Sequence, residues 1–283
     1  MFQRVAILGL GAVGGSIGLA LSQGKAARQV AGYDGGKGIA DQARKLGAID
    51  VVCSQVGDAV RGAELIVLST PVVAMRALLQ QVAGTASAGA VVTDVASTKT
   101  QVISWAEEFL PPTTSFVGGH PITDREGAGI EKADAALFQQ RVYCLVPTRR
   151  TPQAALEKVS VLVDTLGARV RFLEPAEHDG MVAGMQQLPY LISAALMQTV
   201  GGSPSWHDAL LLAGDGLRDA TSPVAGGPEV LRESCLTNSE AVVRWLNDYM
   251  KNLADFRDRI AAHDSSVDDI LKQAKKLRAE WRQ

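Results

Sequence analysis

The sequence has little of what several classes of protein depend on. Aromatic residues make up 5% of its 283 positions, too few for the stacking platforms that hold unpaired bases. Its 28 basic and 30 acidic residues give a net charge of -2, so there is no cationic excess to neutralise a phosphate backbone. We therefore expect a small-molecule substrate as the partner, and no nucleic acid.

Cysteines and long apolar runs are also scarce. The three cysteines, Cys53, Cys144 and Cys235, are far apart and odd in number, which excludes a disulfide framework and a metal-spaced pair. This usage favours a reducing compartment, so we expect a cytoplasmic protein with no metal site. No apolar run approaches the roughly 20 residues that span a bilayer, so we expect no membrane segment. The apolar N-terminus could serve as a signal peptide, but its glycine spacing favours another purpose.

Short apolar runs alternate with helical patterns up to about residue 174. Strands are predicted at "RVAILGL", "QVAGYD", "ELIVLSTP", "GAVVTDVAS", "SFVGGHP", "VYCLVPT" and "ARVRFLEP". This alternation predicts an α/β fold of Rossmann type, a doubly wound parallel sheet with helices on both faces. Ligands of such sheets bind at the carboxyl ends of the strands, which here carry Gly9, Asp34, Thr70, Ser97 and His120.

Residues 175–283 show helical periodicity throughout. The segment "EHDGMVAGMQQLPYLISAALMQTV" reads as one helix with a kink at Pro189. We therefore divide the chain into a dinucleotide-binding domain, residues 1–174, and an all-helical domain, residues 175–283. The apolar stripes of the helical part exceed what a small bundle hides, so we expect it to bind substrate and to form a homodimer.

The glycine-rich turn after the first strand is the main binding motif. Gly9, Gly11 and Gly14 form a G-x-G-x-x-G pattern between a strand and a helix, and Asp34 follows at the end of the second strand. Such a turn brings a pyrophosphate to a helix N-terminus, and the carboxylate binds the adenosine ribose, which favours NAD while leaving NADP possible. The alternative is a structural turn without a ligand. The residues expected to contact the cofactor are Gly9, Leu10, Gly11, Ala12, Val13, Gly14, Asp34, Thr70 and Pro71.

Two further strand ends carry groups suited to chemistry. His120 lies in "GGHP", where a neutral imidazole beside a nicotinamide can take the proton of an alcohol being oxidised. The alternative is a histidine satisfied by the backbone of a turn. Ser97 can line the nicotinamide pocket, or Ser97 and Thr98 can cap the next helix. For His178, which precedes Asp179, a role as a helix cap or domain-interface residue is the stronger interpretation.

Taken together, these motifs resemble the prephenate and arogenate dehydrogenase family of tyrosine biosynthesis. The likeness covers nearly the whole chain: "ILGLGAVGGSIGLAL", "STP", "TDVASTK", "GGHPI", "EGAGIEKADAALF", "LVPT", "EHD" before "QLP", "GLRDAT" and a late "TN". The resemblance implies an enzyme that oxidises a cyclohexadienol, with hydride transfer to NAD(P), loss of carbon dioxide and aromatisation. It implies that His120 assists deprotonation of the ring hydroxyl and that Ser97 lies near this hydroxyl.

The chain departs from the family pattern where the substrate is held. Many members have S-H-L-P-H where this chain has "QQLPY", so Gln187 and Tyr190 replace two histidines. Many also have an arginine shortly after R-D-x-T, and here Arg125 or Arg218 would have to replace it. We take Gln187, Tyr190, Arg125 and Arg218 as candidate substrate-binding residues.

These departures leave the substrate open between prephenate, arogenate and an amino-substituted or other analogue from a specialised pathway. Two other classes also remain. One is an oxidoreductase of the hydroxyacid dehydrogenase type, which would need a catalytic lysine where this chain has none between Lys158 and Lys251. The other is a dinucleotide-binding regulator without catalysis.

Overall fold

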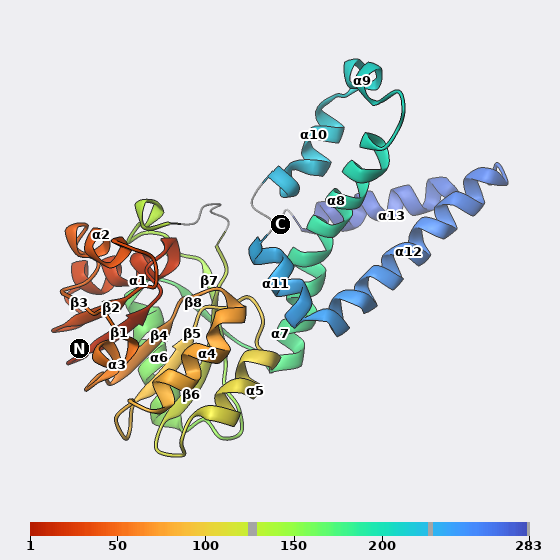
Figure 1. The fold of residues 1–283 in the computed structure, drawn as a ribbon. Helices are drawn as coiled ribbons and strands as arrows, with labels where there is room; N and C mark the ends of the chain where they lie inside the picture. The colour runs from red at the N-terminus through yellow and green to blue at the C-terminus, as the bar shows by residue number, and fades with distance from the viewer. Residues whose placement is uncertain (124–128, 226–228, 282–283) are drawn as a thin grey trace. The chain divides into compact units, whose positions relative to one another are not determined.

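The structure of the chain is a computed structural model that describes residues 1–123, 129–225 and 229–281 (Figure 1). Its contacts divide the chain into two compact units, Met1–Asn238 and Ser239–Gln283. Arg125, one of the candidate substrate-binding residues, lies outside the described residues. The other candidate site residues all belong to the first unit.

An eight-stranded sheet lies at the centre of the first unit (Figure 1). Its strands follow the order β3-β2-β1-β4-β5-β6-β7-β8, and the first six in this order are parallel. The predicted α/β fold is therefore confirmed. The strands are β1 (Val5–Leu8), β2 (Val30–Tyr33), β3 (Val51–Val52), β4 (Leu65–Leu68), β5 (Val91–Asp94), β6 (Ser115–Pro121), β7 (Val142–Val146) and β8 (Arg169–Phe172).

The last two strands add a detail that the sequence patterns did not show. Strand β7 pairs antiparallel with β6, and β8 pairs parallel with β7. A parallel return needs a crossover, usually a helix of a dozen or more residues. In the described part of the β6–β7 connection, the chain forms only the short 3-10 turn η1 (Ile130–Lys132). The short elements β3 and α3 were likewise not predicted.

Helices cover both faces of the sheet and alternate strand residues supply the two cores. Val5 and Ile7 of β1 face the core that α1, α2 and α6 complete. Ala6 and Leu8 face the core of α3, α4 and α5. This arrangement explains the near-continuous apolar strands. The helices are α1 (Ala12–Gln23), α2 (Ile39–Lys45), α3 (Val56–Val60), α4 (Val72–Ala83), α5 (Thr100–Phe109) and α6 (Gln153–Thr165).

The described residues after β8 are mainly helical, as predicted. The segment read as a single kinked helix consists of α7 (Pro175–Val182), the π-helical turn η2 (Ala183–Gln187) and α8 (Leu188–Gly201). The π turn ends just before Pro189, whose ring cannot supply an N–H to a regular helix. The first unit continues through α9 (Trp206–Ala209), η3 (Leu210–Leu212), α10 (Asp215–Thr221), η4 (Ser222–Ala225) and α11 (Glu229–Thr237).

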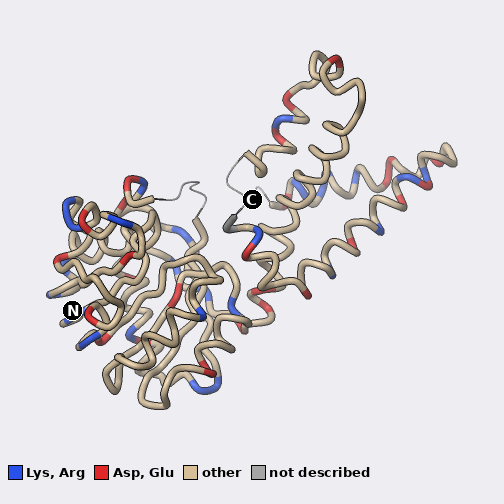
Figure 2. Tube along the Cα trace, viewed as in Figure 1, with Lys and Arg blue, Asp and Glu red and all other residues tan. Residues whose placement is uncertain are grey.

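The second unit contains α12 (Ser239–Ala261) and α13 (Val267–Glu280). The turn between them includes His263, a non-glycine residue with a positive φ of 53°. Basic and acidic positions alternate along α12, whereas α13 begins with acidic residues and continues mainly with basic ones (Figure 2). Across the described ranges of the whole chain, no helix has the length and apolar character needed to cross a bilayer.

Candidate active site

The glycine-rich turn joins β1 to α1. Gly9 has a φ of +98°, and a Cβ there would lie 2.3 Å from the carbonyl oxygen of Ser69. A Cβ on Gly14 would lie 2.0 Å from the carbonyl oxygen of Gly9. Gly11 differs, because the nearest atom among the described residues, the backbone nitrogen of Gly129, would be 4.0 Å away, so none of them crowds this position. The outer glycines therefore allow the turn to close, and the middle one leaves room for a ligand.

The helix that follows this turn begins without a side-chain cap. Gly11 occupies the N-cap position of α1, and no side chain accepts the first backbone N–H groups. Ala12, Val13 and Gly14 form this first turn, so their amides face the same opening. Unpaired amides at a helix N-terminus bind anions such as a pyrophosphate. The geometry thus fits a dinucleotide at the predicted place.

The two kinds of glycine should respond differently to alanine. Gly14→Ala forces a contact with backbone and should lower the free energy of unfolding by about 1–3 kcal/mol. Gly11→Ala should change it by less than about 1 kcal/mol, yet weaken NADH binding by about tenfold or more, because its methyl group occupies the open space. Thermal unfolding without cofactor and NADH fluorescence titration measure the two effects. Full NADH affinity in a folded Gly11→Ala protein would contradict a pyrophosphate at this turn.

Asp34 braces the glycine-rich turn. Its Oδ2 accepts the N–H of Leu10 at 2.7 Å and its Oδ1 accepts the N–H of Gly36 at 2.7 Å. Each carboxylate oxygen can accept a further hydrogen bond, so a ribose hydroxyl can still be held. Thr70 and Pro71 follow β4 beside the turn, and a Cβ on Gly9 would lie 3.0 Å from the Thr70 methyl group. The buried Thr70 hydroxyl has no partner among the described residues.

His120 lies near the end of β6 and is 6% exposed. Its Nδ1 is 2.9 Å from Nε2 of His178, and Nδ1 of His178 is 2.9 Å from Oδ1 of Asp179. Burial, and then the neighbouring His178 and Lys99, hold the pKa of His120 well below its usual 6.5. His120 is therefore neutral at pH 7 and can act as a base.

Asp179 joins α7 to the start of α5. Its carboxylate accepts the backbone N–H groups of Lys99 at 2.7 Å and Thr100 at 2.8 Å. Burial works against the charged form, but the hydrogen bonds from His178, Thr100 and Lys99 outweigh it and lower the pKa of Asp179. The carboxylate is therefore ionised at neutral pH and can act only as an acceptor.

A buried ion pair holds the two strands that carry the catalytic candidates. The Lys99 ammonium contacts the Asp94 carboxylate and donates to the carbonyl oxygen of Gly119 at 2.6 Å; both side chains are fully buried. Asp94 also accepts the N–H of Gly119 at 2.9 Å and of Ala96 at 3.0 Å. Burial lowers the pKa of Lys99, and the nearby Asp94 opposes that change. The pair thereby fixes β6 just before His120 and the loop just before Ser97.

A polar chain from the helical region connects Ser97 with His120. Ser97 donates to the Ser234 hydroxyl at 2.9 Å, and Gln187 also donates to this hydroxyl. Asn238 donates to the Gln187 side-chain oxygen at 2.9 Å and to the Asp179 carbonyl at 2.8 Å. Asp179 leads through His178 to His120. The described contacts therefore join three predicted residues, Ser97, His120 and Gln187, in one network.

Arg218 and Tyr190 share no hydrogen bond with this network among the described contacts. The side chain of Arg218 is 74% exposed and pairs with Asp215 at 2.8 Å. Tyr190 is half-buried in α8. Their assigned contacts with substrate therefore remain predictions, as does that of Arg125.

Sequence reasoning underrated His178 and missed the network around it. His178 is fully buried against His120, and the interpretation as a cap or interface residue did not include that contact. Ser97 and Thr98 do not cap α5, since Lys99 is at its N-cap and no side chain caps it. Thr98 instead lies 3.0 Å from the Thr237 hydroxyl. The one sequence signal was the acidic neighbour of a histidine, His178-Asp179, in a chain with four histidines.

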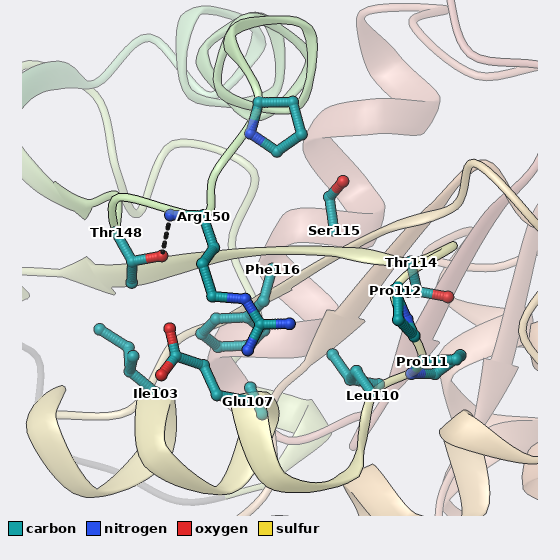
Figure 3. Close-up of a pocket in the computed structure, with 12 residues that line it drawn as sticks. Ile103, Glu107, Leu110, Pro111, Pro112, Thr114, Ser115, Phe116, Thr148 and Arg150 are labelled. Atoms are coloured by element: carbon teal, nitrogen blue, oxygen red, sulfur yellow. Dashed lines mark hydrogen bonds between the residues drawn. The ribbon is translucent and has the colours of Figure 1, made fainter.

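A small cavity lies elsewhere on the sheet (Figure 3). It has a volume of about 150 Å³ and lies between α5, the start of β6 and the segment after β7, with Leu110, Ser115, Phe116 and Arg150 among its lining residues. Ser115 begins β6 and His120 lies five residues on, which is roughly 16 Å along a strand. This cavity is therefore separate from the His120 site.

A glycine-rich turn for a dinucleotide and a buried neutral base at the same sheet edge define a nucleotide-dependent dehydrogenase. Two family models agree with this class. Residues 17–172 match the nucleotide-binding domain of prephenate dehydrogenase, and residues 174–276 match the dimerization domain of prephenate dehydrogenase. The chain belongs to the prephenate dehydrogenase family and is an oxidoreductase, which confirms the resemblance seen in its motifs.

Individual relatives span the chain almost completely. The cyclohexadienyl dehydrogenase of Zymomonas mobilis is 29% identical over 281 residues, which covers 98% of this chain and 96% of that protein. The Aquifex aeolicus prephenate dehydrogenase, solved with hydroxyphenyl propionate and NAD+, has a TM-score of 0.92 at 28% identity and covers 99% and 98%. The Synechocystis arogenate dehydrogenase has a TM-score of 0.87 at 27% identity and covers 99% and 100%.

Proposed function

We propose that this chain catalyses the NAD-dependent oxidative decarboxylation of a cyclohexadienol, either prephenate or arogenate, in tyrosine biosynthesis. The observation that carries the proposal is His120, a buried neutral base whose Nδ1 is held by His178. In the described part of the chain, no group is hydrogen-bonded to its Nε2. A base of this kind, at the strand ends beside a dinucleotide turn, suits removal of a proton from a hydroxyl group.

The chain's own residues handle the proton. Nε2 of His120 accepts the proton of the ring hydroxyl as that carbon is oxidised. When carbon dioxide leaves and the ring becomes aromatic, the ring oxygen is a phenolate, and His120 can return the same proton to it. Ser97 orients the hydroxyl from the loop after β5, where Ser234 holds its side chain. The step therefore needs no net uptake or release of a proton by the protein.

The cofactor proposed is NAD, which supplies the hydride acceptor when bound. Gly9 to Gly14 would hold its pyrophosphate, Asp34 the adenosine ribose, and Thr70 and Pro71 the nicotinamide end. Asp34 supports NAD over NADP, because its carboxylate would repel a 2′-phosphate at close range. The turnover assay below tests whether NADP serves as a weaker alternative cofactor.

The substrate-holding residues distinguish this chain from many relatives. Gln187 and Tyr190 would contact the part of the substrate away from the hydroxyl, and Arg125 or Arg218 would pair with a carboxylate. A buried glutamine is neutral at every pH, so Gln187 supports a substrate group that needs hydrogen bonds more than charge. We infer a cytoplasmic homodimer in which residues 175–283 form the interface and residues 1–174 bind the dinucleotide. Cysteine usage supports the compartment, and the matched dimerization model supports the assembly.

A turnover assay tests the proposal directly. Purified protein is given prephenate or arogenate, each with NAD and with NADP, and formation of the reduced nicotinamide is followed by absorbance. We expect turnover with one or both substrates and a higher kcat/KM with NAD. Activity with arogenate alone would explain the "QQLPY" segment as specificity. Tight NADH binding without turnover on either substrate would overturn the proposal in favour of an analogue or a regulator.

A further inference from the structure

We propose that Asp179 and His178 are positioning residues that hold His120 in the tautomer with a bare Nε2. The expected effect on turnover rests on the proposed function, whereas the tautomer of His120 does not. The evidence is a chain of two hydrogen bonds, each 2.9 Å long, that begins at a carboxylate and ends at Nδ1 of His120. The roles along this chain follow from which groups are able to donate.

The carboxylate determines the first bond. An ionised carboxylate accepts hydrogen bonds and donates none, so Nδ1 of His178 must carry a proton toward Oδ1 of Asp179. The proposal gives His178 this single ring proton, which leaves its Nε2 as an acceptor. The same carboxylate already accepts two backbone N–H groups at the start of α5. These donors keep it in place and in its charged form.

The hydrogen bond between His178 and His120 then determines the tautomer of His120. Since Nε2 of His178 is an acceptor, Nδ1 of His120 must donate to it across their 2.9 Å contact. The neutral His120 ring then has its lone pair on Nε2, the nitrogen proposed to take the substrate proton. The opposite tautomer would place an N–H there, and such a ring could not act as a base. The Asp179 carboxylate does not touch the substrate in this arrangement. It would act through His178 to determine whether His120 can accept a proton.

The surroundings resist the opposite arrangement. His178 is completely buried and Asp179 is 4% exposed, so water cannot readily replace either hydrogen-bond partner. Asn238 donates to the Asp179 carbonyl and fixes the backbone that carries the carboxylate. Besides the Asp179 carboxylate, Lys99 is close enough to lower the pKa of His120, and its ammonium is paired with Asp94. No second acceptor within the described residues competes with His178 for Nδ1 of His120.

The first experiment is a nitrogen-15 NMR measurement of the histidine rings in the full-length protein without ligands, at pH 7. Replacing His120, His178, His207 and His263 singly by glutamine assigns the four rings. We expect the ring proton of His120 on Nδ1, with a bare Nε2, and a proton on Nδ1 of His178. A proton on Nε2 of His120 in the unsubstituted protein would overturn the proposal. This readout involves no substrate, so it stands apart from any failure of the turnover assay.

The second experiment uses Asp179→Asn, whose amide can donate to Nδ1 of His178. We expect a population of His120 protonated on Nε2, and a decrease in kcat of about 10²- to 10⁴-fold, with a smaller change in KM. Asp50→Asn is the matched control, since Asp50 also accepts a buried backbone N–H, from Val30 at 2.7 Å, but contacts no histidine. A lower kcat with an unchanged His120 tautomer would show a merely structural role and overturn the proposal.

A double variant also distinguishes a positioning role of Asp179 from a merely structural one. In His178→Gln combined with Asp179→Asn, the glutamine oxygen can accept from Nδ1 of His120 and its amide can donate to the asparagine oxygen. We expect this double variant to have a higher kcat than Asp179→Asn alone and to regain the bare Nε2. A double variant no more active than the single one, with Nε2 still protonated, would count against the proposed relay.

Discussion

Replacing His120 by asparagine should reduce kcat by about 10²- to 10⁴-fold, the usual contribution of a general base. The asparagine side chain is shorter than imidazole and has a donor and an acceptor near the position of Nδ1, so contact with His178 can be kept. It has no basic lone pair where Nε2 lies, so the hydroxyl proton has no acceptor. The dinucleotide turn is formed by other residues, and NADH affinity should therefore stay unchanged.

Steady-state kinetics and NADH titration measure these two quantities on the same preparation. His207→Asn is the matched control, because His207 is exposed on α9 and contacts none of the network. It should have the kcat of the unsubstituted enzyme. Normal turnover in His120→Asn would remove His120 from the chemistry, and a parallel loss of NADH affinity would indicate a misfolded nucleotide site.

The largest effect on stability should come from Lys99→Met. The substitution leaves the Asp94 carboxylate buried without its cation, and breaking a buried ion pair in this way costs about 3–5 kcal/mol. Asp94 keeps its two backbone N–H donors, but its fully buried side chain has no cation beside it. Chemical denaturation should show the loss as a lower midpoint. The loop that carries Ser97 and the strand that carries His120 should lose their common support.

Two comparisons make this prediction specific. Arg76→Met removes an exposed pair, Arg76–Glu108 at 3.5 Å, and should change the free energy of unfolding by less than about 1 kcal/mol. Adding Asp94→Asn to Lys99→Met removes the unpaired charge and should recover part of the lost stability. If Lys99→Met unfolded at the same denaturant concentration as Arg76→Met, the buried pair would not be a structural support.

Much of the dinucleotide half of the site could be predicted from local sequence. Gly9, Gly11, Gly14 and Asp34 lie within two strands and one turn, and their roles depend on spacing that the sequence displays. His120 could be predicted to lie at the sheet edge because a buried strand precedes it. The proton-handling half could not be predicted in the same way. His178 lies 58 residues from its partner His120, and no local pattern links them.

In the helical region, too, local sequence predicts the helices but not the contacts between distant residues. Its helical character follows from periodicity, but the π turn that ends at Gln187 depends on how Pro189 and the neighbouring helices pack. Ser234 lies 137 residues from Ser97, and its hydrogen bond exists only because α11 meets the loop after β5. Asn238 belongs to the late "TN" of the family pattern, which by itself does not say that it holds Gln187 and Asp179.

By itself, the sequence determined the family and the α/β sheet with a helical continuation, and it predicted the dinucleotide turn and the base, whose roles stay predictions. These rest on short-range spacing and on the burial of apolar strands, which local chemistry dictates. The tertiary structure alone decided that β7 turns antiparallel, that Lys99 is buried on Asp94, and that Asp179 reaches His120 through His178. Those features depend on contacts between residues that are distant in the chain. These residues meet in the protein interior, where water is excluded and each buried donor must find an acceptor.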